Sequence, residues 1–334
     1  MQNLSMKNET KLKGLLKMIK TSTFLTLSLA LISLLSAGDF KINGDTHFNY
    51  NFEDAENNAF QISRAYFSVQ KKVSDVISYK FQTDVGYGGA TDFTVYLKNA
   101  KLDWKTDFGK LTFGLQGMNM FNIQENNWGY RFIEKSVMDN NKYSSSADLG
   151  IGWEKKFGVL TPGLLITNGT GYKKVEDDQY KKLSLRLLYG ESKLKKGLNA
   201  GVVVSTESED YTTTSATVET GNTLIIGGFG GFVTGGLRTG AEFALKSEKM
   251  ESNTSAQLLS LYGNYKINKK LSGFGRFDLV DPDSDTDSDG YNYLIIGLNY
   301  QPEKVFYIAP NVKMKMPETG DAETTYQVNF RFKI

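Results

Sequence analysis

The most constraining feature of the sequence is an alternation of apolar and polar side chains that recurs along most of its length and continues to its last residue. In the final ten residues, TYQVNFRFKI, one set is apolar: Tyr326, Val328, Phe330, Phe332 and Ile334. Between them stand Gln327, Asn329, Arg331 and Lys333. Successive side chains of a β-strand point to opposite faces, so this segment has one apolar and one polar face. Soluble sandwiches and membrane barrels both use such strands, and they differ in which face meets water.

Sixteen segments with this period follow one another after residue 38, and no helical pattern longer than about ten residues interrupts them. They are centred on 40–52, 65–69, 77–87, 100–104, 111–115, 149–153, 160–166, 183–189, 198–204, 224–233, 237–245, 259–265, 271–279, 294–300, 306–314 and 326–334. An even number of antiparallel strands can close into a barrel, and closure removes the edges that lipid cannot satisfy. The sequence therefore predicts an all-β, transmembrane, antiparallel β-barrel of sixteen strands.

The connections between these segments support the barrel. Those after even-numbered segments are short, whereas the long ones all follow odd-numbered segments: 117–146, 168–180, 207–222 and 280–290. Long and short connections on opposite ends are typical of outer-membrane barrels. Aromatic residues also gather near the ends of the apolar rows, where a barrel places its interfacial girdles. A soluble sandwich does not readily explain sixteen strands whose second face carries Lys, Asp and Asn.

The N-terminal residues 1–38 have the pattern of a cleaved export signal. Lys20 precedes an apolar stretch from Phe24 to Leu35, and the small residues Ser36, Ala37 and Gly38 follow. The stretch is short for a membrane span, and an uncleaved anchor helix is the alternative. A start at Met18 gives a signal of ordinary length. Residues 39–334 are then one barrel domain.

Composition excludes several classes of function. Without residues 1–38, which contain five lysines and one glutamate, the chain keeps 34 basic and 36 acidic residues, a balance that does not favour nucleic-acid binding. There is no cysteine, so disulfides and catalytic thiols are absent. The single histidine, His47, lies near Asp45, and no hydrolase, phosphate-loop or metal motif is present. The sequence predicts no enzymatic activity.

The signal, the strand ladder and the closing strand 326–334 together resemble Gram-negative outer-membrane porins. The stretch from Ala59 to Gly86 is also similar to the phosphate-selective porins O and P, although no arginine ladder of that group is visible. The closing strand departs from the usual insertion signal because it ends in Ile334 instead of Phe. The resemblance implies a homotrimer in the outer membrane, in contact with its lipid and lipopolysaccharide and inserted by the barrel-assembly machinery. It also implies passive diffusion of small hydrophilic solutes and ions.

In the general porins, which have sixteen strands, the loop between strands 5 and 6 folds into the lumen. The resemblance implies the same here for residues 118–146. This is the longest connection, and its aromatic residues can anchor it to the wall: Phe121, Trp128, Tyr130 and Phe132. Glu125, Glu134 and Asp139 are then candidates to face the pore. The alternative is a surface loop that covers the barrel mouth.

Basic residues predominate on the polar face of the strands, and the candidates for the pore lining are Lys41, Arg64, Lys80, Lys101, Arg276 and Arg331. Rings of Lys and Arg lower the barrier for anions, so a mild anion preference is expected. Arg64, Lys80 and Arg331 come from strands near the closure, and we expect them to form one basic cluster facing the folded loop. The alternative is that they pair with Asp45 and Asp84 and only satisfy a polar interior.

Two further hypotheses concern ligands. The loop 281–290 has Asp285, Asp287 and Asp289 before Gly290, a spacing that suits Ca²⁺, but the twelfth position of an EF-hand would be Ile296. A looser calcium site and a plain acidic surface loop both remain open. Inward aromatic residues favour a second transport hypothesis, a selective channel for phosphate or sugars, in which sugars stack on Tyr66, Phe274, Tyr291, Tyr293 and Tyr307. A plugged structural or adhesive barrel is the non-transport alternative.

Overall fold

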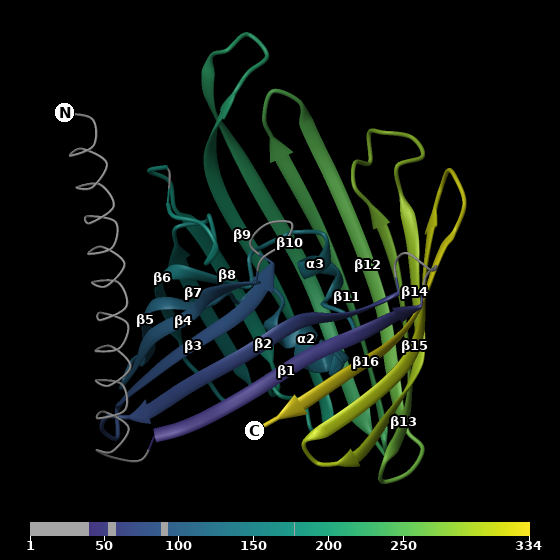
Figure 1. Cartoon of the computed structure of the whole chain (residues 1–334). Coiled ribbons are helices and arrows are strands. Elements are labelled where there is room, and N and C mark those ends of the chain that lie inside the picture. The colour runs from purple at the N-terminus through teal and green to yellow at the C-terminus, as the bar shows by residue number, and fades with distance from the viewer. Residues whose placement is uncertain (1–39, 53–57, 88–92, 177) are drawn as a thin grey trace, which may run out of the picture. The chain divides into compact units, whose positions relative to one another are not determined.

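The computed structural model describes residues 40–52, 58–87, 93–176 and 178–334. The expected export signal, residues 1–38, and the alternative start at Met18 lie outside these residues. The described residues form a closed antiparallel barrel (Figure 1). Its strands are β1 (Phe40–Phe52), β2 (Ala59–Lys72), β3 (Ile77–Tyr87), β4 (Phe93–Thr106), β5 (Gly109–Gly117), β6 (Ala147–Glu154), β7 (Leu160–Thr167), β8 (Lys182–Tyr189), β9 (Gly197–Thr212), β10 (Val218–Thr234), β11 (Leu237–Lys249), β12 (Asn253–Lys266), β13 (Leu271–Asp281), β14 (Tyr291–Glu303), β15 (Phe306–Pro317) and β16 (Glu323–Lys333). The predicted sixteen-stranded fold is confirmed.

The first and last strands close the barrel with apolar residues facing one another. β1 pairs with β16 from Asp45 opposite Lys333 to Phe52 opposite Tyr326. On the outer face, the rings of Phe48 and Phe330 stack with their centroids 4.6 Å apart. Because every strand is hydrogen-bonded on both sides, the barrel leaves no free strand edge among the described residues.

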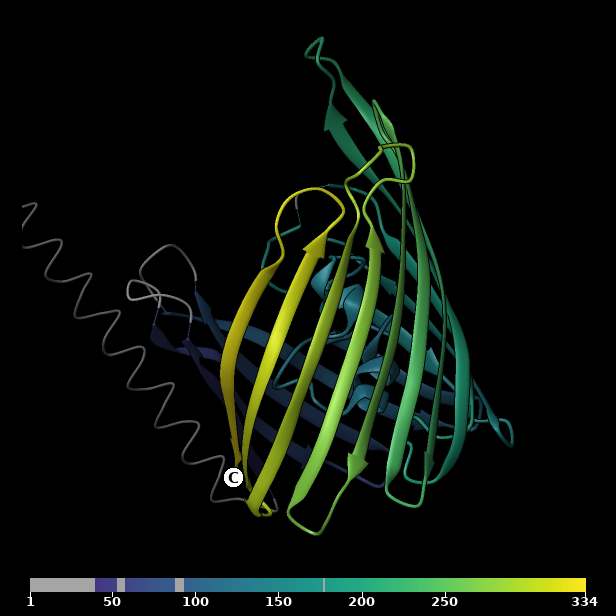
Figure 2. The ribbon, with the colours of Figure 1, turned by 90° about the vertical axis from the view of Figure 1, so that its right-hand side faces the viewer.

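Turns of two to seven residues join the strands at one end, and the longest connections, 118–146, 168–181 and 282–290, lie at the other end together with short ones such as the three residues between β11 and β12 (Figure 2). One predicted loop is wrong. Most of residues 207–222 belong to β9 and β10, which remain paired up to Thr212 opposite Val218. This segment is rich in Glu, Ser and Thr, and its β-branched residues favour a strand even where both faces are polar. The result is a hairpin longer than the sequence pattern indicated.

The barrel is inverted relative to a soluble protein. On β12, Leu261 on the outer face is 51% exposed, whereas its neighbour Ser260 on the inner face is fully buried. The same contrast separates Ile296 from Asn299 on β14. No helix among the described residues is long and apolar enough to cross a membrane. Apolar side chains outside and polar side chains inside are the arrangement that a bilayer requires of a barrel.

This inversion predicts a depth-dependent cost for charge on the outer face. We expect Leu261→Arg to destabilise the barrel by about 2–4 kcal/mol, because its guanidinium would lie near the bilayer midplane. Tyr265→Arg on the same face of β12, nearer the turn, should cost only about 0–1 kcal/mol. Denaturant titration of the barrel in lipid vesicles measures the free energy of unfolding of both variants. Equal destabilisation by the two substitutions would contradict the placement of Leu261 near the bilayer midplane and of Tyr265 near its edge.

A β-bulge changes which residues of β4 point inward. Gln82 pairs with Asn99 but Thr83 pairs with Leu97, so Lys98 is the extra residue. Lys98 and Asn99 are therefore both buried on the inner side, whereas Leu97 is exposed. Strict alternation counted back from Lys101 would place Lys98 outside. The doubled polar pair in the sequence is the signal of the bulge.

Candidate functional site: a constricted lumen

The connection between β5 and β6, residues 118–146, lies inside the barrel and is called the inner loop below (Figure 1). It contains two short helices, α2 (Asn122–Trp128) and α3 (Val137–Asn140). α2 ends at Gly129, whose φ of 77° suits the left-handed conformation that glycine adopts without strain. The four aromatic anchors predicted from the sequence, Phe121, Trp128, Tyr130 and Phe132, are all buried. The predicted inward folding of this loop is confirmed.

The inner loop packs on an apolar patch of the inner wall. Trp128 makes edge contacts with Tyr262 and Phe274, and Tyr130 lies against Phe274 with ring centroids 4.9 Å apart. A second cluster joins residues of both helices to the wall, among them Met120, Ile123, Val137, Met138, Ile225, Phe229 and Leu258. Burial of these side chains from the aqueous lumen supplies the hydrophobic contribution that holds the loop.

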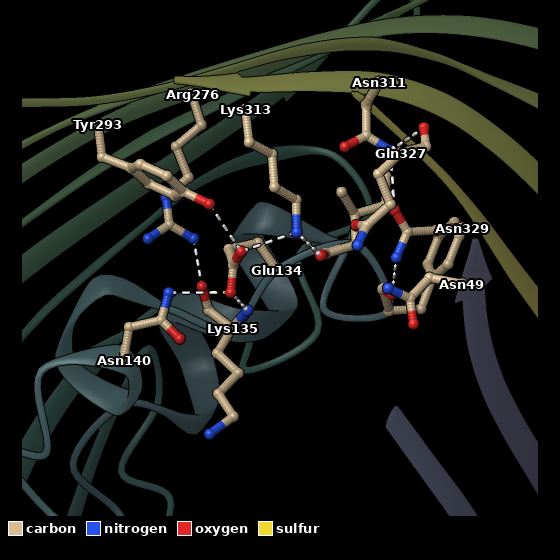
Figure 3. Close-up of polar contacts among 12 residues, drawn as sticks. Asn49, Glu134, Lys135, Asn140, Arg276, Tyr293, Asn311, Lys313, Gln327 and Asn329 are labelled. Carbon is tan, nitrogen blue, oxygen red and sulfur yellow. Dashed lines mark hydrogen bonds and ion pairs between the residues drawn. The ribbon is translucent and has the colours of Figure 1, made fainter. Parts of the chain in front are cut away.

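Glu134 is the main polar anchor of the inner loop (Figure 3). One of its carboxylate oxygens lies 2.9 Å from Nζ of Lys313 and accepts a hydrogen bond from the Tyr293 hydroxyl at 3.1 Å. Its other oxygen accepts from Asn140 at 3.0 Å. Lys313 also donates to the carbonyl of Ile133 at 2.8 Å, so one lysine holds two consecutive loop residues. The carboxylate of Glu134 thus binds side chains of the wall and does not face the pore.

Arg276 of β13 forms a second anchor between the wall and the loop (Figure 3). Its guanidinium makes a bidentate ion pair with Asp278, with distances of 2.8 and 2.6 Å, and both side chains are almost completely buried. It also donates to the carbonyl of Lys135. Farther along the wall, Asn329 donates to the carbonyl of Phe132 at 3.2 Å. Arg276 therefore joins the loop to the wall and is buried, so it does not line an open part of the lumen.

The contact between Glu134 and Lys313 depends on pH. Burial alone would raise the pKa of Glu134, but the charge and hydrogen bond of Lys313 outweigh burial and lower that pKa from 4.5 to about 2. A lowered native pKa contributes stability that is complete above about pH 4.5 and is lost as the pH falls through about 2. We expect the loop to stay anchored from pH 7 to pH 4 and to loosen near pH 2. Current fluctuations of single barrels in planar bilayers, recorded at each pH, test this, and fluctuations that begin at pH 5 would contradict it.

The inner loop contacts most of the wall but not all of it. Hydrogen bonds join it to β8 through Asn119 and Ser184, to β9 through Asn127 and Asn199, and to β11 through the carbonyl of Asn126, which accepts from Arg238. The anchors above add β13, β15 and β16. Among the described residues, its only hydrogen bond to β2, β3 or β4 is from Lys98 to Ser146, at 2.6 Å. The inner faces of β2–β4, called the open arc below, are therefore tied to the loop by this one hydrogen bond.

Charged residues of both signs lie on the open arc. Asp84 lies 3.6 Å from Arg64 and 3.9 Å from Lys98. Closer to the short-turn end, Lys101 is paired with Asp103 at 3.0 Å, and Lys80 stands opposite Lys101 in the β3–β4 register. The sequence analysis placed Arg64, Lys80 and Lys101 here but missed Lys98, which the bulge turns inward.

Three charged residues of the inner loop form an internal ion triad. Arg131 pairs with Glu125 and, at 2.9 Å, with Asp139. Burial raises the pKa of Glu125, although Arg131 opposes this effect. Two of the three predicted loop acids are thus grouped around one arginine, whereas the third, Glu134, faces the opposite wall. Arg131 was not predicted, because its role depends on how the loop folds back on itself.

The remaining predicted pore residues are separated from this group. Arg331 forms a bidentate ion pair with Asp45, at 2.8 and 2.6 Å, and His47 contacts the same carboxylate at 3.1 Å. The structure thus gives Arg331 the cross-strand pairing that the sequence analysis held open. Lys41 lies exposed near the start of β1. Arg64, Lys80 and Arg331 do not form one unpaired basic cluster.

Two cavities lie along the open arc and the adjoining wall. The larger, about 640 Å³ and called the vestibule below, opens toward the long loops. Its lining includes Arg64, Asp84, Asp139, Ser144 and Tyr172. The smaller, about 280 Å³, lies toward the short turns. It is lined by residues that include Lys80, Asn99, Lys101, Gln116 and Arg186.

Two ligand hypotheses concern residues that the structure describes. Among the described residues no three acidic or histidine side chains are grouped to hold a metal ion, and the calcium site at Asp285, Asp287 and Asp289 stays a prediction. Of the five aromatic residues expected to stack sugars, four contact the inner loop instead. Phe274 packs on Trp128 and Tyr130, Tyr307 on Phe132, and the hydroxyls of Tyr291 and Tyr293 bind Asn141 and Glu134.

A closed sixteen-stranded barrel narrowed by an internal loop is the architecture of bacterial porins, and comparison with solved structures agrees. The chain is similar to an anion-selective porin from Comamonas acidovorans, with 12% identity, 89% of this chain and 99% of that chain covered, and a TM-score of 0.67. It is similar to the trimer form of OmpT, an outer membrane protein of Vibrio cholerae, with 13% identity, coverage of 89% and 100%, and a TM-score of 0.65. It is also similar to the outer membrane channel DcaP of Acinetobacter baumannii, with 15% identity, coverage of 88% and 96%, and a TM-score of 0.60. No protein-family model and no curated protein matches the chain. At these identities the likeness establishes the porin fold.

Proposed function

We propose that the chain is a non-enzymatic channel in the outer membrane of a Gram-negative bacterium, through which small hydrophilic solutes and ions diffuse passively. One observation carries the proposal: inside a barrel with an apolar outer face, the inner loop is held against the wall from β8 to β16, and two cavities of about 640 and 280 Å³ with charged linings remain along the open arc and the adjoining wall. Water and polar solutes favour such a surface, and conduction along it requires no chemistry. The porins and the channel among the similar folds support the same function.

Planar-bilayer recording of the purified barrel tests this proposal. We expect stepwise, ohmic currents in potassium chloride. A variant in which residues 122–140 are replaced by a short Gly-Ser linker is the control, because it removes the loop and keeps the strands. If the wild type is silent while this variant conducts, the protein is a plugged barrel and the proposal is wrong. Folding of both proteins is checked by the electrophoretic mobility of unheated samples.

We also propose a mild anion preference. The middle of the open arc carries Arg64, Lys80, Lys98 and Lys101 against only Asp84 and Asp103. An excess of wall cations lowers the electrostatic barrier for anions. The similarity to an anion-selective porin supports this preference, and the Discussion describes its test.

The assembly and surroundings of the barrel are part of the same proposal. A homotrimer is supported by the trimer form of the similar Vibrio cholerae protein. Chemical cross-linking of the protein in intact outer membranes should give a trimeric band, and an exclusively monomeric band would contradict it. Contact with lipopolysaccharide and insertion by the barrel-assembly machinery follow from the proposed location.

A further inference from the structure

The vestibule contains a buried guanidinium without a hydrogen-bond acceptor. Arg64 is only 8% exposed, and none of its N–H groups donates a hydrogen bond to another described residue. A guanidinium has five N–H donors, and leaving them unpaired away from bulk water costs free energy. Its contact with Asp84, 3.6 Å at the closest, is longer than a hydrogen bond. An anionic oxygen bound beside Arg64 would remove this cost.

The same cavity contains the complementary group. Asp84 is 4% exposed and accepts no hydrogen bond within the described part of the chain. Its two cationic neighbours lie at 3.6 and 3.9 Å, so its oxygens retain their capacity to accept. The hydroxyls of Tyr143 and Ser144, which line the same cavity, are also buried without a partner in the structure as described. The vestibule thus offers an unused cationic donor and an unused anionic acceptor next to each other.

Aromatic rings fix the positions of the cations. The guanidinium of Arg64 lies 4.8 Å from the centroid of the Tyr66 ring, and Nζ of Lys98 lies 4.3 Å from that of Tyr172. Cation–π contacts of this length restrain a charged side chain without using its hydrogen-bond donors. Lys98 donates one hydrogen bond, to Ser146, and keeps two further N–H groups. The site is therefore held in place by groups that do not compete with a solute.

From this geometry we infer that the vestibule is a binding site for small carboxylates that carry a hydrogen-bond donor on the neighbouring carbon, as hydroxy acids and amino acids do. The carboxylate lies against Arg64, and the adjacent ammonium or hydroxyl donates to Asp84, both of which line the cavity. The inference rests on the proposed function, because a solute reaches the site through the lumen. A carboxylate without the second group satisfies Arg64 but leaves Asp84 unpaired, and it therefore binds more weakly.

Three probes of equal carbon number separate the two contacts: propionate, lactate and alanine. Calorimetric titration of the full-length, detergent-purified barrel is expected to show that lactate and alanine bind about tenfold more tightly than propionate, as one charge-assisted hydrogen bond would give. Arg64→Gln should weaken all three by a similar factor. Asp84→Asn should bring the affinity for alanine down to that for propionate, because the ammonium of alanine needs the negative charge of Asp84. Asp84→Val should do the same for both alanine and lactate, because it also removes the hydrogen-bond acceptor. Lys195→Gln, an exposed residue of the β8–β9 turn, is the matched control and should change nothing.

The outcomes are distinct. Equal affinity of the wild type for the three probes, or an advantage that survives Asp84→Val, would overturn the assignment. A variant that binds none of the probes is interpreted only if its unheated electrophoretic mobility shows a folded barrel. Two different replacements at Asp84, Asn and Val, are made so that a folding failure of one leaves the other for the test. Because the titration needs no current, a barrel that binds but does not conduct would refute the channel and leave the site standing. A barrel that conducts without binding would do the reverse.

Discussion

Replacement of Glu134 with alanine will release the inner loop from the far wall and will turn steady currents into fluctuating ones of larger amplitude. The substitution leaves the ammonium of Lys313 buried beside Tyr293 without its carboxylate. Breaking a buried ion pair by removing one partner costs about 3–5 kcal/mol. The substitution weakens the contact between the loop and the wall, because the backbone hydrogen bonds of β15 do not depend on Glu134. Single-channel recording measures the fluctuations, and thermal unfolding in detergent measures the remaining stability.

Glu191→Ala is the matched control for this prediction. Glu191 also pairs with a lysine, Lys156, and at a similar distance of 3.0 Å. Both of these side chains are more than half exposed, so the pair is worth no more than about 1 kcal/mol. We expect the current of this variant to match that of the wild type. Quiet, unchanged currents in Glu134→Ala would show that the apolar clusters alone hold the loop.

Neutralising the cations of the open arc will reverse the ion preference. In Arg64→Gln/Lys98→Gln the arc loses two positive charges while Asp84 stays, and the reversal potential in a salt gradient should move toward cations. One unit charge a few ångströms from the ion path is worth about 1 kcal/mol even in a watery environment, or roughly a fivefold change in permeability ratio. Asp84→Asn should move the potential the opposite way. Together the two variants test sign as well as size.

Charge-matched variants away from the constriction make the result interpretable. Lys195→Gln/Lys196→Gln removes two exposed positive charges from the β8–β9 turn, and Asp107→Asn removes one negative charge from the β4–β5 turn. At 0.1 M salt, charges farther than about 10 Å from the ion path are screened. These variants should therefore keep the wild-type reversal potential. If they shift it as much as the arc variants do, selectivity arises from the total charge of the barrel and not from the arc.

The fold was predictable because the pattern that specifies it is local. Alternation with a period of two assigns each strand its lipid face, and each strand pairs with the strands before and after it in the sequence. The first strand was expected to span 40–52 and does so. The loop predicted at 207–222 failed because a hairpin that extends beyond the apolar belt has two polar faces, so hydrophobic alternation gives no sign of it.

The constriction was less predictable because it depends on tertiary contacts. The aromatic anchors of the inner loop were identified because large apolar side chains in a connection need a surface on which to pack. Their partners on the wall were not identified: Phe274 was assigned to sugar stacking, and Ile295, another apolar residue of the inner face, was not singled out. The positions of charged residues in the sequence could not show whether Glu134 faces the pore or the wall, because its partner Lys313 is 179 residues away in the chain. Lys98 was missed because one inserted residue reverses the alternation.

The placement of the inner loop has a consequence for the order in which the molecule matures. The loop is synthesised before β6, yet it is held by strands that emerge much later, with partners up to 197 residues away at Asn329. Contacts between such distant parts of a chain form late. Until the last strands are in place, the inner loop lacks its anchors on β15 and β16, so the lumen reaches its final width only when these strands have joined the sheet.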